Sequence, residues 1–181
     1  NRVTDNFGVV GGGWGNVAGD NDPALFTGLG ATVAGGVVNS ATANSSTVGG
    51  GSGNQASANF ATIAGGINQL ASGEGSTVAG GSQNIAQALQ STIGGGSFQV
   101  ATGSNATIAG GLENTASGVQ STIGGGRGHD ATAFVSTVAG GLQNIAAGSF
   151  ASVGGGTANT AGGQGSDVSG GSSNAASGEF S

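Results

Sequence analysis

The chain has 181 residues, of which 43 are glycine, and it contains no cysteine, methionine or tyrosine. Two arginines, no lysine and a net charge of −6 exclude a nucleic-acid binder, which needs basic residues to neutralise phosphates. A single histidine without cysteine excludes zinc and iron–sulfur sites. A membrane-spanning helix needs about twenty continuous apolar residues, and no stretch of the chain approaches that length.

A period of 15 residues organises the chain. A β-branched residue precedes each glycine pair, at Val33, Val48, Ile63, Val78, Ile93, Ile108, Ile123, Val138, Val153 and Val168. Val10 begins an earlier copy 23 residues before Val33, so we expect a loop insertion near 20–27. A fixed period of this kind is typical of a solenoid. We therefore expect one domain over residues 1–181, built from about eleven repeats.

The unit Ser76–Gln90 defines fifteen columns, numbered from one at Ser76. Columns one to four favour a strand, because Thr in column two adjoins Val or Ile in column three. Strand alternation directs column three inward and columns two and four outward. We expect the Gly-Gly pair in columns five and six to make one turn. A second strand then directs the Ala of column eleven inward, and the frequent Gly of column thirteen makes the second turn.

This arrangement predicts an all-β protein, a parallel β-solenoid with one flattened coil per repeat. A helical repeat is excluded because a glycine pair costs about 2 kcal/mol of helix propensity in every unit. If neighbouring coils pair through their backbones at a spacing of ~4.8 Å, we expect the stack to form a rod about 50 Å long.

Column nine is mostly asparagine, and we expect these amides to form a structural ladder that satisfies the polar groups of the turns. Its members are Asn39, Asn54, Asn84, Asn114, Asn144, Asn159 and Asn174, preceded by Asn16. Gln69, Gln99 and His129 replace asparagine in three coils.

Column two carries a rank of eight threonines that forms a possible contact face. They are Thr32, Thr47, Thr62, Thr77, Thr92, Thr107, Thr122 and Thr137. At the strand spacing they lie in line on one face of the rod. The rank suits either the close approach of a neighbouring chain or, as an alternative function, binding of ice by a monomeric solenoid.

Per coil, the evident interior is one Val or Ile and one Ala, which is thin for fifteen ordered residues. We therefore expect further apolar burial between chains, in a parallel oligomer or an end-to-end filament. Aliphatic and aromatic residues in columns seven, ten and fifteen, such as Trp14, Leu70, Ile85 and Phe60, are the candidates for that interface.

These repeats resemble the head repeats of trimeric autotransporter adhesins of the YadA type. Ser76-Thr77-Val78-Ala79-Gly80-Gly81, then Asn84 and Ala86, follow that family's order, and the match covers essentially the whole chain. The resemblance implies a left-handed parallel β-roll that is trimeric, extracellular and adhesive. Two features depart from the family: Gly80 and Gly110 stand where it has a second inward aliphatic, and the repeat is one residue longer.

We find no constellation of residues typical of an enzyme, no cofactor motif and no metal motif, because the eight acids fall in different columns and coils. The sequence thus predicts a non-enzymatic extracellular fibre or adhesin segment. Its expected partners are itself and a host or matrix surface, with no membrane insertion in this segment. The repeat with Arg127, His129 and Asp130 is the least regular; it is interpreted as drift at an exposed turn, with a ligand contact or a pH-sensitive break as alternatives.

Overall fold

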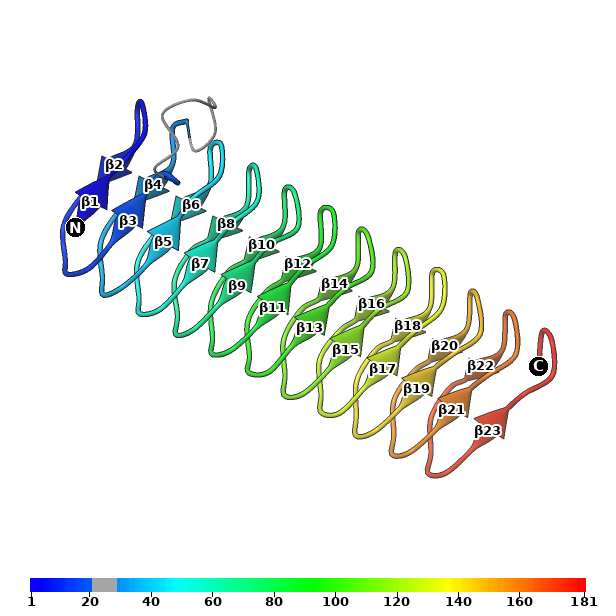
Figure 1. The fold of residues 1–181 in the computed structure, drawn as a ribbon. Coiled ribbons are helices and arrows are strands. Elements are labelled where there is room, and N and C mark those ends of the chain that lie inside the picture. Colours follow the sequence, from blue (N-terminus) through cyan, green and yellow to red (C-terminus); the bar gives the residue numbers. More distant parts are fainter. Residues whose placement is uncertain (21–28) are drawn as a thin grey trace.

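A computed structural model describes residues 1–20 and 29–181, and shows a rod of stacked coils (Figure 1). Apart from Asp20, the insertion expected near 20–27 lies outside the described residues. Two parallel sheets run along the rod, one of 12 and one of 11 strands. The all-β solenoid predicted from the 15-residue period is therefore confirmed.

Each strand is two residues long, shorter than the four columns expected to form it. The 12-stranded sheet contains β1 (Arg2–Val3), β3 (Val17–Ala18), β5 (Ser40–Ala41), β7 (Gln55–Ala56), β9 (Leu70–Ala71), β11 (Ile85–Ala86), β13 (Val100–Ala101), β15 (Thr115–Ala116), β17 (Asp130–Ala131), β19 (Ile145–Ala146), β21 (Thr160–Ala161) and β23 (Ala175–Ala176). The 11-stranded sheet contains β2 (Val9–Val10), β4 (Thr32–Val33), β6 (Thr47–Val48), β8 (Thr62–Ile63), β10 (Thr77–Val78), β12 (Thr92–Ile93), β14 (Thr107–Ile108), β16 (Thr122–Ile123), β18 (Thr137–Val138), β20 (Ser152–Val153) and β22 (Asp167–Val168).

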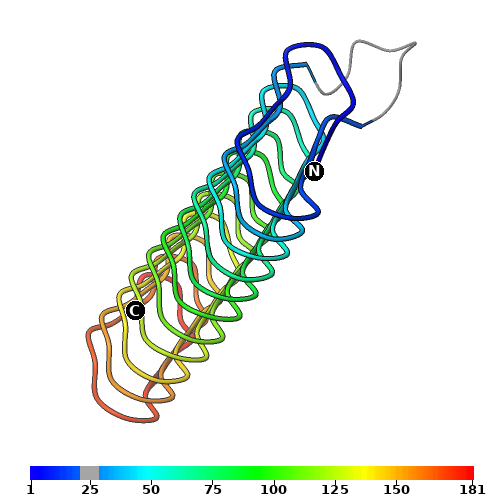
Figure 2. The same ribbon diagram turned by 90° about the vertical axis from the view of Figure 1, so that its left-hand side faces the viewer.

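Successive coils stack without a shift in register. Thr77 pairs with Thr92 and Val78 with Ile93, and Ile85 pairs with Val100 in the other sheet. Column seven adds a third line of parallel bridges, from Trp14 to Ser172. In the view of Figure 2, coil after coil repeats the same outline along the rod. Residues of one column therefore form a rank along the rod.

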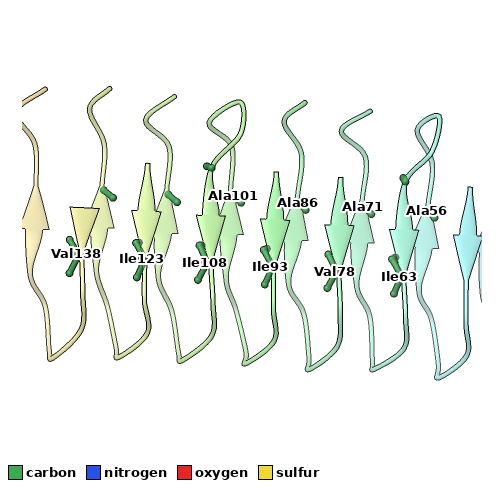
Figure 3. Close-up of a cluster of buried hydrophobic side chains, with 14 of the residues drawn as sticks. Ala56, Ile63, Ala71, Val78, Ala86, Ile93, Ala101, Ile108, Ile123 and Val138 are labelled. Carbon is green, nitrogen blue, oxygen red and sulfur yellow. The ribbon is translucent and has the colours of Figure 1, made fainter. Parts of the chain in front are cut away.

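The interior is filled by two apolar ranks that face each other across the coil, as Figure 3 shows for Val78 and Ala86. Between coils two and ten, the Val or Ile of column three and the Ala of column eleven are buried throughout. The inward direction predicted for both columns is confirmed. Column one, which is Ala or Ser, and column nine are also buried, so each coil has four inward positions rather than two.

The turn positions that adopt a left-handed backbone differ from those expected. In the first turn, column six is left-handed, as in Gly81 (φ 95°), whereas column five is not at Gly80. In the second turn the glycine of column thirteen is not left-handed. There Ser76 donates its N–H to the Gly73 carbonyl (3.0 Å), and the left-handed residue is Gly75, in column fifteen. That pattern is a type II turn from column thirteen to the next column one.

Candidate functional site: a buried amide ladder and an exposed threonine face

The asparagines of column nine connect each coil to the next through the backbone. Asn84 Nδ2 donates to the Gly80 carbonyl of its own coil (2.9 Å) and to the Gly96 carbonyl of the following coil (3.0 Å). Its Oδ1 accepts the N–H of the next column-nine residue, Gln99 (3.0 Å). One buried amide thus makes three hydrogen bonds that hold the Gly-Gly turn against its neighbour.

The predicted ladder residues share this arrangement along most of the rod. Asn39, Asn54, Asn114, Asn144 and Asn159 make the same three kinds of bond. Asn174, in the last coil, is exposed and keeps the bond to the carbonyl of its own coil, at Gly170. Only Asn159 and Asn174 also donate to the amide oxygen of the preceding asparagine (3.2 Å). The ladder is therefore mainly a side-chain-to-backbone structure.

The three replacements in column nine keep the acceptor of the ladder and lose its donor. Gln69 Oε1 accepts the N–H of Asn84 (2.8 Å), Gln99 Oε1 that of Asn114 (3.0 Å), and His129 Nδ1 that of Asn144 (3.0 Å). The Nε2 atom of each replacement is buried without a hydrogen-bond partner. Sequence reasoning identified the exceptions but not this defect, which depends on where the longer side chain places its nitrogen.

His129 is fully buried (0% exposed), so its interpretation as part of an exposed turn is wrong. Burial lowers the pKa of His129 below its ordinary value of 6.5, and the backbones of Gly141 and Asn144 and the Asp130 carboxylate act in the opposite direction. The Nε2 atom makes no hydrogen bond, so the nearby Gly141 carbonyl does not satisfy it. Nearby, Arg127 and Glu113 form an exposed ion pair (3.3 Å).

The threonine rank lies on the outer side of the 11-stranded sheet. Its members pair in register, as Thr92 does with Thr107, and they are partly exposed, with Thr122 the most exposed of the eight. The hydroxyl of Thr32 makes a long bond to the Gly30 carbonyl (3.4 Å). Within the described chain, the hydroxyls from Thr47 to Thr137 make no hydrogen bond to protein. The rank thus presents a line of solvent-facing hydroxyl and methyl groups.

The glycines of column five form a rank that the chain itself does not require. A Cβ placed on Gly80, Gly95 or Gly110 meets no atom within 4 Å, and none of these residues has a left-handed backbone. All eleven column-five residues are nevertheless glycine, from Gly12 to Gly170. Gly125 and Gly155 have a positive φ (155° and 158°) that favours glycine, but at the other nine positions neither internal packing nor a left-handed backbone explains the residue.

Large apolar side chains are exposed along both turns of the rod. One turn carries Trp14, Val37, Val38, Ile67, Phe98 and Leu142, and the other carries Phe7, Phe60, Leu89, Val119, Phe134, Phe150 and Phe180. The rings of Phe134 and Phe150 meet edge to face, with 5.3 Å between centroids. The aliphatic residues of column ten, such as Leu70 and Ile85, are half-buried instead. Columns seven, eight, fourteen and fifteen therefore offer more apolar surface than column ten.

No group of three or more His, Asp or Glu side chains that could hold a metal ion occurs in residues 1–20 and 29–181. The same residues form no helix that could cross a membrane. A scan against models of known protein families finds no match to this chain, and a search of curated proteins finds no significant relative.

Proposed function

We propose that this chain is a non-enzymatic rod in an extracellular fibre or adhesin head. In this role it assembles side by side with copies of itself as a homotrimer and presents repeated contact faces to a host or matrix surface. The resemblance to trimeric adhesin heads and the unbroken register of the coils both support this proposal. A stack in which each coil contacts only its neighbours is suited to extended, regular surfaces.

The observation that carries the proposal is the open column-five glycine rank. Where glycine is neither left-handed nor packed against its own chain, a close approach by another backbone accounts for it. The approaching surface must repeat along the rod, because the rank does. A second copy of the chain has the required repeat.

The surface next to this rank is compatible with such an approach. Columns two and four carry Thr and Ala or Gly over most of the rod, so no long or charged side chain stands above the sheet between Thr32 and Thr137. The apolar residues along the turns, including Ile67 and Phe98, lie exposed in the single chain and would be covered on assembly.

The test is the mass of the chain in solution, measured by light scattering after size exclusion at several concentrations. We expect a mass near three times the 16.5 kDa of one chain. A monomer at every concentration would overturn the proposal. A mass that grows with concentration without limit would replace the closed trimer with an end-to-end filament.

Two triple variants locate the interface. Gly80→Ala, Gly95→Ala and Gly110→Ala together add three methyl groups to the open rank, and we expect them to lower the mass. Gln87→Ala, Thr102→Ala and Ser117→Ala change three exposed residues beside the other sheet and should leave the mass unchanged. If the second variant dissociates the assembly and the first does not, the interface lies on the other face.

A second function, ice binding by a monomeric solenoid, is favoured by one specific observation. The hydroxyls from Thr47 to Thr137 have no protein partner and repeat at the strand spacing of ~4.8 Å. A flat, uncharged array of this kind can order water in register with its own repeat.

The ice-binding alternative is tested by inhibition of ice recrystallisation. If the rank binds ice, Thr92→Tyr with Thr107→Tyr should abolish the activity, because bulky rings break the flat face. Thr102→Tyr with Thr132→Tyr, at exposed threonines beside the other sheet, should retain it. No activity in the unmodified monomer would exclude this function.

A further inference from the structure

We propose that His129 makes the junction between residues 121–135 and residues 136–150 an acid-labile seam in the rod. This property is independent of whether the rod serves adhesion or ice binding. It concerns the one ladder position whose side chain can change charge near neutral pH.

The hydrogen bonds of His129 define its protonation state. Its backbone N–H donates to Asn114 Oδ1 (2.9 Å), and its Nδ1 accepts the N–H of Asn144 (3.0 Å). An atom that accepts a hydrogen bond carries no proton, so the ring is neutral with its proton on Nε2. In this form His129 continues the ladder in place of asparagine.

A second proton on the ring would replace the hydrogen bond between Asn144 and Nδ1 with a repulsive contact between two donors. Nδ1 would become a donor facing the Asn144 N–H, and the charge would lie in a fully buried ring. The junction between the two coils would lose its acceptor at column nine. Neither asparagine nor glutamine, which occupy every other ladder position, can undergo this change.

The charged groups around the ring are few. In the preceding coil the only titratable residue is Glu113, which pairs with Arg127 at the surface, and the following coil, residues 136–150, has none. Asp130, the first residue of β17, directly follows His129, and its carboxylate favours the charged form of the imidazole. Over the range in which histidine titrates, His129 is therefore the group at this junction that takes up a proton.

The pH dependence follows from comparing the closed and the open seam. In the closed seam the pKa of His129 is lowered, chiefly by burial, whereas in an opened seam the ring recovers its ordinary value of 6.5. The open state therefore binds more protons below pH 6.5. The stability of the closed seam is complete above that value and declines as the pH falls below it. Because each coil contacts only its neighbours, the weakening stays local to this junction.

Hydrogen exchange on the full chain tests the seam at single amides. We expect the protection factor of the Asn144 amide, corrected for the intrinsic rate at each pH, to fall by up to about tenfold between pH 7.5 and pH 5.5. The amides of Asn84 and Asn114 are internal controls, because they bond to the Oε1 atoms of Gln69 and Gln99. Their protection should not change.

His129→Gln supplies the matched variant, since glutamine already occupies the same column in two other coils. It keeps the acceptor and cannot titrate, so the fall at Asn144 should disappear. If this variant does not fold, His129→Asn restores the residue of the regular ladder and serves the same purpose. An Asn144 amide that stays protected at pH 5.5 in the unmodified chain would overturn the proposal, as would a fall that persists in either variant.

Discussion

The two glycines of the Gly-Gly pair have different physical roles in every coil except those of Gly125 and Gly155, where the column-five glycine also has a positive φ. Gly81, in column six, has a φ of 95°, and a Cβ on it would lie 2.0 Å from the Gly96 carbonyl oxygen of the next coil. Gly80, in column five, has no left-handed backbone, and a Cβ there meets nothing within 4 Å. The fold of one chain explains the first glycine and not the second. Repetition within a sequence therefore identifies a constraint without saying whether it comes from inside the chain or outside it.

Gly81→Ala should have the greatest effect on stability. The new methyl group clashes with backbone that cannot move without shifting the stack, and the residue is left-handed as well. We expect a loss of about 3 kcal/mol or more in the free energy of unfolding, measured by denaturant titration. Gly128→Ala is the matched control, because Gly128 is also left-handed (φ 66°) but a Cβ on it comes only within 3.5 Å of Gln143. A cost of about 1 kcal/mol there would separate backbone strain from the clash.

Gln69→Asn tests the bonds that join the two glycine ranks. A regular ladder amide donates to a column-five carbonyl in its own coil and a column-six carbonyl in the next, whereas Gln69 Nε2 has no partner. Asparagine at this position should restore both bonds and raise the free energy of unfolding by about 1 kcal/mol. Unchanged or reduced stability would mean that the two bonds contribute little at this turn. Gln55→Asn, at an exposed position on β7, controls for the change in side-chain length.

Gly80→Ala should have the least effect on the chain itself. With open space around the new methyl group, we expect the stability of the single chain to change by less than about 0.5 kcal/mol. If a second copy approaches this rank, the variant should instead lose the part of its stability that increases with protein concentration. Denaturant titrations at several concentrations measure both parts. A large loss that is independent of concentration would show that column five is constrained from inside the chain.

The three ladder replacements show how far sequence reasoning extends into the candidate site. The column-nine rank was predictable because the 15-residue register alone places its members above one another. Which backbone groups the amides bond was not, because the partners belong to the glycine turns of two different coils. The unpartnered Nε2 atoms of Gln69 and Gln99 depend in turn on the length of each side chain within that turn.

The left-handed residues are a second feature that the sequence conceals. Val38 and Val135 (both φ 54°) and Phe98 (φ 57°) occupy such turn positions, although β-branched and bulky residues disfavour this conformation. Columns eight and fifteen are left-handed in every described coil whatever residue they hold. The backbone there follows the coils above and below it, so the stack overrides local preference.

The sequence by itself determined the number of coils, the parallel pairing and the two apolar ranks, because a strict period and a two-residue alternation leave one register in which like residues stack. The tertiary structure alone decided which glycines are packed and which are open. It also decided which ladder donors lack a partner and that His129 is buried. These properties depend on distances between neighbouring coils, which cannot be derived from the identity of the residues that repeat in each coil.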